Sequence, residues 1–207
     1  MSSMDKWSTL PSKETIEETI KALKKNNIDA YFVETAEDAK NKFFEILPEG
    51  AEVLNNSSVT LDTIGISKEI MESKKYDAVK NKLMAMDRKT QKREMQKLGS
   101  APQWAVGSVH AVTKDGHVLI ASNSGSQIPG YSFGAEHVIW VVGAQKIVKD
   151  IDEGIKRIFE HSLPLESQRV KIAYGMPESA VRRILILENE AMQGRSTLIF
   201  VNEVLGY

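Results

Sequence analysis

The chain has 207 residues and a mass of 23.1 kDa, which is enough for one domain with a sizeable hydrophobic core. Its formal net charge is −1 and neither half carries a basic excess, so charge argues against a protein that binds nucleic acid. There is no cysteine, which excludes disulfides, thiolate nucleophiles, zinc–thiolate sites and cysteine-held iron–sulfur clusters within the chain.

The first quarter of the sequence predicts helices that alternate with strands. An N-terminal helical segment covers about residues 1–30, with a capped amphipathic helix that begins at Ser12 and ends at Asn26-Asn27. A strand, a second helix and another short strand follow at Ala30–Glu34, Ala36–Leu47 and Glu52–Leu54. This alternation indicates an α/β fold.

A polar cluster follows the second predicted strand. Where a strand runs into a helix, hydroxyls, amides and free backbone N–H groups can bind an anion. The candidate ligands here are Asn55, Ser57, Ser58 and Thr60. The alternative interpretation is plain helix capping, which serine and threonine perform in many proteins.

Residues 66–98 predict a helical and polar cover rich in lysine and methionine. Lys89, Arg93 and Lys97 are spaced four apart, which predicts one shared helix face. A solvated surface helix explains this face better than a nucleic-acid interface, because no aromatic residues interleave to stack bases. A surface for a protein partner is the other interpretation.

Residues 105–123 predict a hairpin, with Ala105–Thr113 and His117–Asn123 flanking a Lys114-Asp115-Gly116 turn. A polar loop then leads into a buried strand at His137–Gly143. Polar loops at strand ends often bind ligands in α/β proteins, while a serine-rich turn is the alternative. The candidate ligands in this loop are Ser122, Asn123, Ser126 and Gln127.

The last third predicts a helix followed by strands. Asp150 caps a helix that runs through Ser162, and Pro164 stops it. Val170–Tyr174 is a candidate strand, and we expect a terminal hairpin whose first limb has helical as well as strand character. Its limbs are Arg183–Glu190 and Ser196–Val204.

The catalytic residue remains unknown at this level, although a few ionisable side chains are candidates. Glu136 and His137 lie next to the polar loop and have the chemistry of an acid–base pair, with capping or surface placement as the alternative. Arg195 and Lys146 are candidates for binding a carboxylate or phosphate, or else surface charges. No histidine has a partner at metal-ligand spacing, so we expect neither a metal nor a cofactor.

The N-terminus lacks the apolar core of a signal peptide. No uncharged apolar run approaches the ~18 residues of a membrane span. We therefore expect a cytoplasmic protein with no membrane partner.

Two runs of sequence resemble the lactate-utilisation (LUD) domain family. They are Gly107–Pro129, which reads GSVHAVTKDGHVLIASNSGSQIP, and Gly134–Val148, which reads GAEHVIWVVGAQKIV. The likeness extends from about residue 12 to Tyr207, so the resemblance implies a single LUD domain over residues 1–207. It also implies a Rossmann-like three-layer α/β fold, similar to the ribose-phosphate isomerase and CoA-transferase group, with β-hairpins added. Residues 55–60 lack the glycines of the sugar-phosphate enzymes.

The resemblance implies that the protein binds a small anionic metabolite. One expected role is the non-redox subunit of an L-lactate oxidation system, in which an iron–sulfur partner protein carries the electrons. The alternative is a stand-alone isomerase or CoA-transferase-like enzyme for a phosphorylated or acyl substrate, with Glu136 or His137 as base. A homo-oligomer is a further expectation.

Overall fold

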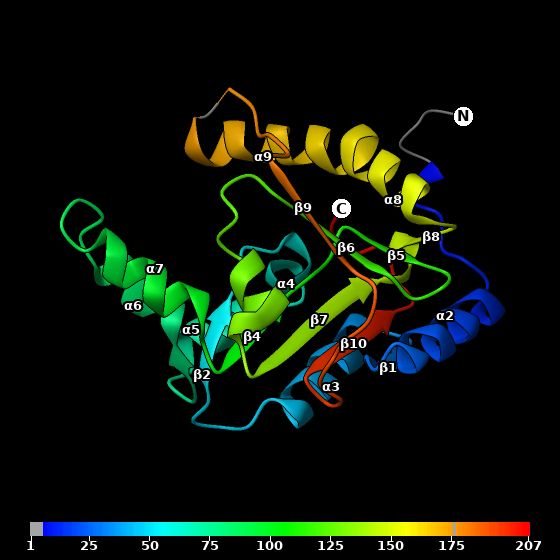
Figure 1. Ribbon diagram of the computed structural model, residues 1–207, viewed down its shortest axis with the longest axis horizontal. Helices are drawn as coiled ribbons and strands as arrows, with labels where there is room; N and C mark the ends of the chain where they lie inside the picture. Colours follow the sequence, from blue (N-terminus) through cyan, green and yellow to red (C-terminus); the bar gives the residue numbers. More distant parts are fainter. Residues whose placement is uncertain (1–5, 176) are drawn as a thin grey trace.

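Six parallel strands form the larger of two sheets in the computed structural model, which describes residues 6–175 and 177–207 (Figure 1). The strand order is β1 (Asp29–Val33), β10 (Ser196–Val201), β7 (His137–Gly143), β4 (Trp104–Gly107), β2 (Glu52–Asn55) and β3 (Asp77–Ala78). The central strands β7 and β10 are nearly continuous apolar runs, as is typical of parallel strands covered on both faces. The predicted α/β class with a Rossmann-like sheet is confirmed.

Three helices cover one face of this sheet. They are α3 (Ala36–Ile46), α4 (Val59–Thr63) and α5 (Ile66–Glu72). A capping box at Thr35 and Asp38 begins α3, because each side chain accepts a backbone N–H of the other residue. The helices and the sheet share a buried cluster that includes Phe43, Leu61, Ile66, Ile70, Val106, Ile139, Val141 and Ile199.

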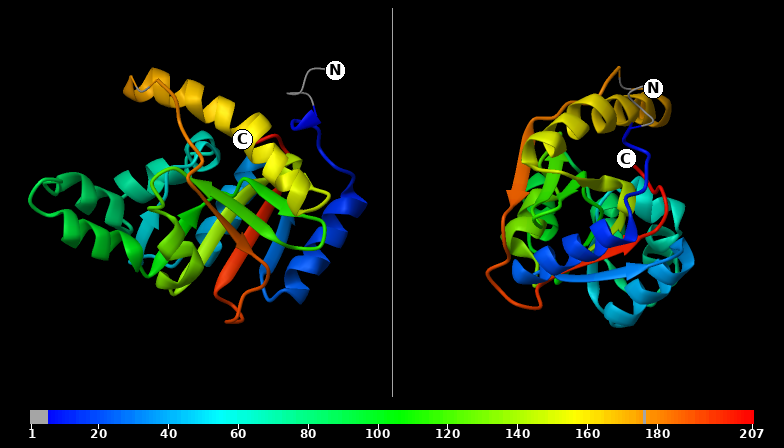
Figure 2. Two further views of the ribbon diagram at one scale, coloured as in Figure 1. Left: turned by 45° about the horizontal axis from the view of Figure 1, so that its top comes forward. Right: turned by 90° about the vertical axis from the view of Figure 1, so that its right-hand side faces the viewer.

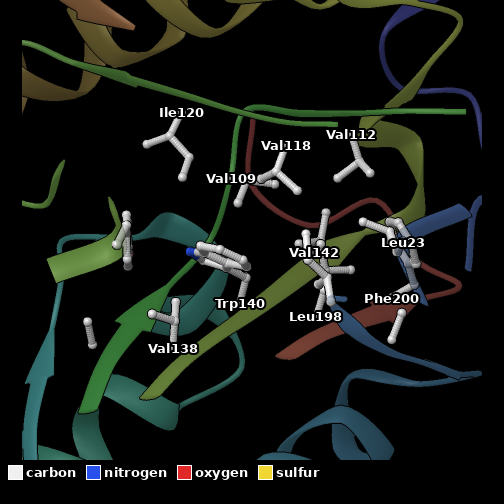
Figure 3. Packing of buried hydrophobic residues seen from close by; sticks show 14 of the residues in the cluster. Leu23, Val109, Val112, Val118, Ile120, Val138, Trp140, Val142, Leu198 and Phe200 are labelled. Atoms are coloured by element: carbon white, nitrogen blue, oxygen red, sulfur yellow. The ribbon is translucent and has the colours of Figure 1, made fainter. Parts of the chain in front are cut away.

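A second sheet covers the opposite face together with helix α2 (Lys13–Lys25), which Ser12 caps as predicted. Its strand order is β8 (Ile147–Val148), β5 (Ala111–Thr113), β6 (Val118–Ser122) and β9 (Arg183–Leu187). Figure 3 shows side chains of β5 and β6 meeting those of β7 and β10 across one hydrophobic layer, which includes Leu23, Val112, Val118, Ile120, Val138, Trp140, Val142, Leu198 and Phe200.

Two further segments cover the outside of the second sheet. They are α8 (Ile151–Arg157) and the π-helix η3 (Ile158–Ser162), which pack on Ala111, Leu119 and Ala121. Figure 2 shows this run crossing over the small sheet, with the six-stranded sheet below it. On this side the small sheet covers the large sheet, and the helical segments α8 and η3 cover the small sheet in turn.

The predicted terminal hairpin is wrong, because its two limbs belong to different sheets. β9 pairs antiparallel with β6 at the edge of the small sheet, while β10 lies between β1 and β7 in the large one. All six residues of β10 are buried, whereas in β9 Arg183 is exposed and the other four residues are half-buried. The two successive strands therefore join different sheets: the fully buried β10 takes an interior position in the large sheet, and the less buried β9 takes an edge position in the small one.

The predicted strand at Val170–Tyr174 is also wrong. These residues form the end of helix α9 (Leu163–Tyr174), which continues directly from η3. Pro164 does not stop the helix, because it lies in the first turn of α9. The π-helical turn η3 lies directly before it and replaces the ordinary i→i−4 hydrogen-bond pattern that a proline inside an α-helix would break.

Two other expectations are only partly met. In the predicted hairpin, β5 and β6 do pair around the Lys114–Gly116 turn, but Trp104–Gly107 is β4 of the large sheet. Residues 66–98 hold α5, strand β3, α6 (Val79–Ala85) and α7 (Lys92–Ser100). Lys89 lies in the turn before α7, so it does not share a helix face with Arg93 and Lys97. Within the described ranges, no helix is long and apolar enough to cross a membrane.

Arg195 binds the start of β10 to the π-helix η1 (Gly130–Gly134). Its guanidinium donates to the carbonyls of Ala135 (3.0 Å), Tyr131 (3.1 Å) and Gly130 (3.0 Å). It also donates to Glu190 Oε2 at 2.7 Å, and both partners of this ion pair are almost fully buried. Arg195 therefore binds carbonyls at both ends of η1 and has a structural role.

We expect the Arg195→Gln substitution to lower the free energy of unfolding by about 3–5 kcal/mol, because it leaves the Glu190 carboxylate buried without its counter-ion. Urea denaturation followed by circular dichroism measures this loss. Lys171→Gln on the exposed side of α9 is the control, with an expected change within about 0.5 kcal/mol. A loss of the same small size for both variants would contradict the structural role.

Candidate functional site

A cavity of about 420 Å³ lies where four strands of the large sheet end. Its lining includes residues from the segments that follow β2 (Asn56–Thr60), β4 (Ser108–His110), β7 (Lys146) and β10 (Tyr207). Because all four strands are parallel, these segments emerge at the same edge of the sheet, where α/β proteins bind ligands. The loop after β6 and the side of α9 complete the wall.

Seven of the predicted ligand-binding residues line this cavity. They come from two loops more than 60 residues apart in sequence, and the fold places both loops at one site. The residues are Ser57, Ser58, Thr60, Ser122, Asn123, Ser126 and Gln127. That they bind a ligand stays a prediction.

Four other predicted residues lie outside the cavity. Asn55 is buried in β2, and its amide has no hydrogen-bond partner among the described residues. Arg195 is in the ion pair with Glu190. Glu136 lines a separate depression, and the His137 ring stacks on Trp104 with centroids 4.3 Å apart. The last two lie at the amino end of β7, opposite the end that reaches the cavity.

The loop after β6 is braced from within. The Ser122 hydroxyl donates to Gln127 Oε1 at 2.9 Å and accepts the Gly125 N–H at 2.8 Å, while Gln127 Nε2 donates to the Ala121 carbonyl at 3.1 Å. The side chain of Asn123 makes no hydrogen bond within the described part of the chain. Ser122 and Gln127 therefore shape the loop, and Asn123 is left able to contact a ligand.

Lys146 is the most unusual residue of the cavity wall. Its side chain is 1% exposed, and Nζ donates to Thr60 Oγ1 (3.3 Å), Ser108 Oγ (3.2 Å) and the Val109 carbonyl (3.2 Å). No carboxylate forms an ion pair with it among the described residues. Burial, together with the charge of Arg157, holds the pKa of Lys146 well below its usual range.

A second buried cation lies close to this lysine. Arg157 is fully buried, and its Nη1 donates to the His110 carbonyl (2.5 Å) and to Ser162 Oγ (3.2 Å). Its Nε and Nη2 have no partner within the described residues, and burial lowers the pKa of Arg157 to about 10. The interior behind the cavity thus holds positive groups that no carboxylate compensates.

His110 has a low pKa for the same reason. Burial, followed by the charges of Lys146 and Arg157, lowers the pKa of His110 to about 3. The ring is therefore neutral at physiological pH, and its Nδ1 accepts the Ala121 N–H at 3.1 Å. It connects β6 to the chain that leaves β4.

The one carboxylate of α9 that lines the cavity is already occupied. Glu166 accepts two hydrogen bonds from Arg169 (2.7 and 2.8 Å) and one from the Tyr207 hydroxyl (2.5 Å). Burial raises the pKa of Glu166, but these hydrogen bonds outweigh it and the pKa is lowered overall. The negative charge of Glu166 is thus engaged at the rim and does not pair with Lys146.

Gly107 leaves room for a tyrosine in the floor of the cavity. A Cβ at this position would overlap the Tyr131 hydroxyl, which donates to the Val106 carbonyl at 3.4 Å. The Tyr131 ring also packs edge-on against Trp140 with centroids 5.6 Å apart. The last residue of β4 is therefore small because Tyr131 occupies the space beside it.

The residues that sequence reasoning passed over share one signal. Ser108 and Tyr207 each follow a buried parallel strand, as Lys146 does, and strand ends are where ligands bind in this class of fold. Over the ranges that the structure describes, no group of three or more His, Asp or Glu residues could hold a metal ion. Besides the carboxylates of Asp62 and Glu166, the site therefore offers hydroxyls, amides and the buried amine of Lys146.

We expect the stability of the protein to fall as the pH decreases from about 6.5 to about 3, in part because of His110. In this window the unfolded chain binds a proton at His110 that the folded chain does not. His110→Asn keeps a hydrogen-bond acceptor but cannot be protonated there, so its stability should depend less steeply on pH. Urea denaturation at several pH values measures both slopes, and equal slopes would contradict the prediction.

A substitution at Gly107 tests the packing of the cavity floor. We expect Gly107→Ala to cost about 1–3 kcal/mol of stability, because the new methyl group overlaps the Tyr131 hydroxyl. Combining it with Tyr131→Phe should recover part of this loss, and chemical denaturation of the double-mutant cycle measures the coupling. Gly99→Ala in α7, where the added Cβ has space, is the matched control and should be neutral or stabilising. Additive losses would show that the two residues do not compete for space.

Comparisons with known proteins agree with this architecture. The structure resembles the crystal structure of a DUF162 family protein from Deinococcus radiodurans, with a TM-score of 0.56 and 12% sequence identity over 93% of this chain and 99% of that one. No curated protein matches the sequence. The LUD domain family matches residues 16–199. Because this match spans most of the chain, the protein belongs to the LUD domain family.

Proposed function

We propose that the protein binds a small organic anion in the cavity at the carboxyl ends of β2, β4 and β7. The observation that carries this proposal is Lys146, a buried lysine in the cavity wall without a carboxylate partner. Lysine is rarely buried unless it is paired, because removing its charge from water costs several kcal/mol. An anionic ligand would supply the missing partner.

The rest of the lining supports an anion rather than a cation or an apolar molecule. Arg157 adds a second buried positive charge behind the wall, and Glu166 is already bound by Arg169. Hydroxyl and amide groups from the two polar loops supply hydrogen-bond donors for carboxylate or phosphate oxygens. The volume of about 420 Å³ falls in the range of ordinary metabolite sites.

Family membership narrows the ligands worth testing. The family takes its name from lactate utilisation, so L-lactate and pyruvate come first, followed by phosphorylated and acyl compounds. Within an L-lactate oxidation system this chain would be the non-redox subunit, because it has no cysteine to hold an iron–sulfur cluster. Such a cluster would belong to a partner protein. The isomerase or transferase alternative with Glu136 or His137 as base gains no support, since neither residue lines the cavity.

Calorimetric titration with L-lactate, pyruvate, a sugar phosphate and a CoA ester tests the proposal. For the ligand that binds, we expect Lys146→Met to weaken the affinity at least about tenfold, because the substitution removes the buried positive partner. The same substitution should leave the stability unchanged or raise it, since a buried amine without a counter-ion is replaced by an apolar chain. Both the affinity and the urea midpoint are measured.

Lys114→Met in the exposed β5–β6 turn is the matched control and should bind like the unaltered protein. An unchanged affinity in Lys146→Met, with the fold intact by circular dichroism, would show that this residue does not hold the ligand. Failure of every compound class to bind would remove the proposal itself.

A further inference from the structure

Lys146 has the features of a reacting amine as well as those of a charge. Its Nζ is at the cavity wall, held by three hydrogen bonds in a fixed position at the end of β7. Lysines become nucleophiles when they are desolvated or lie beside another cation, because both conditions favour the neutral amine. Here burial and Arg157 supply both conditions, and they lower the pKa of Lys146.

The neighbours of Nζ fit a neutral amine. The three contacts measure 3.2–3.3 Å, and their acceptors are two hydroxyls and a carbonyl, none of which carries a charge that would hold a proton on the amine. A neutral amine has two N–H groups and one lone pair. The Val109 carbonyl and the hydroxyl oxygens of Thr60 and Ser108 accept from Nζ, so any two of them can accept the N–H groups of a neutral amine and leave its lone pair free.

We propose that the Lys146 amine forms a reversible imine with the carbonyl group of a 2-oxo acid bound in the cavity. This inference rests on the proposed anion site and names the class of its ligand. A 2-oxo acid combines the two groups that the cavity can bind, a carbonyl for the amine and an adjacent carboxylate. Ser57 and Asn123, whose side chains make no hydrogen bonds within the described residues, line the same cavity and are suited to the carboxylate.

The step needs no oxidant, reductant or further reactant. The lone pair of Nζ attacks the carbonyl carbon, so that a C–N bond forms and the electrons of the C=O π bond move to oxygen. A proton moves from nitrogen to that oxygen, which gives a neutral carbinolamine. The C–O bond then breaks, the second N–H proton passes to the departing hydroxyl, which leaves as water, and a C=N bond forms. The net change is amine plus carbonyl to imine plus water.

Reductive trapping with sodium borohydride tests the inference on the intact chain. Glyoxylate and pyruvate are the probes, because each is a small 2-oxo acid. With pyruvate, intact mass spectrometry should show a gain of one pyruvic acid less one oxygen atom, and peptide mapping should place it on Lys146. Propanal, a neutral aldehyde of similar size, should be trapped at least about tenfold less, since it lacks the carboxylate.

Lys146→Arg separates the reaction from simple charge pairing, because arginine carries a positive charge but does not form this adduct. We expect the variant to lose the trapped product, while calorimetry still detects the oxo acid. If the variant does not fold, peptide mapping of the unaltered protein still shows whether the trapped adduct is on Lys146.

Three results would overturn the inference. Binding of a 2-oxo acid without any trapped adduct would leave the anion site standing and exclude the imine. An adduct spread over surface lysines such as Lys114 would show non-specific chemistry. A chain that binds no probe at all would remove both the imine and the anion site on which it depends.

Discussion

The parallel direction of all six strands in the large sheet is the constraint on which the site depends. Each segment that leaves a strand at its carboxyl end emerges at one edge, so β2, β4, β7 and β10 deliver their following residues to the same place. The loop after β6 and helix α9 wall the cavity at that edge. A polar site with a desolvated interior is the result.

Desolvation then determines the chemistry of that interior. Two cationic side chains are buried behind or within the wall, and the nearby carboxylate is held by Arg169 and a tyrosine. A protein gains no stability from such an arrangement, because buried charge without a counter-ion is costly. Proteins often accept this loss of stability at functional sites, where the perturbed pKa values of buried groups serve binding or catalysis. Lys146, His110 and Arg157 share this origin.

Much of the fold could be predicted from local patterns, but the pairing of strands could not. The cap at Ser12, strand β7 and the Lys114–Gly116 turn depend on neighbouring residues and were predictable. The assignment of β9 and β10 to different sheets depends on burial across the whole molecule. In the site, both polar loops carried a visible signal. Glu136 and His137 were close to a loop in sequence but at the wrong end of a strand, because strand direction is a property of the assembled sheet.

The position of β10 has a consequence for how the chain is assembled. This strand comes last in the sequence, yet it lies inside the sheet and bridges β1, from the first 33 residues, to β7. During synthesis β1 has no neighbour to join until residue 201 has left the ribosome, and until then the free edge of β7 is exposed. Closing the sheet requires contacts across more than 160 residues, and such distant pairings slow folding. Until β10 pairs, the edges of β1 and β7 that it joins have no partner in the large sheet, and unpaired strand edges are prone to aggregation.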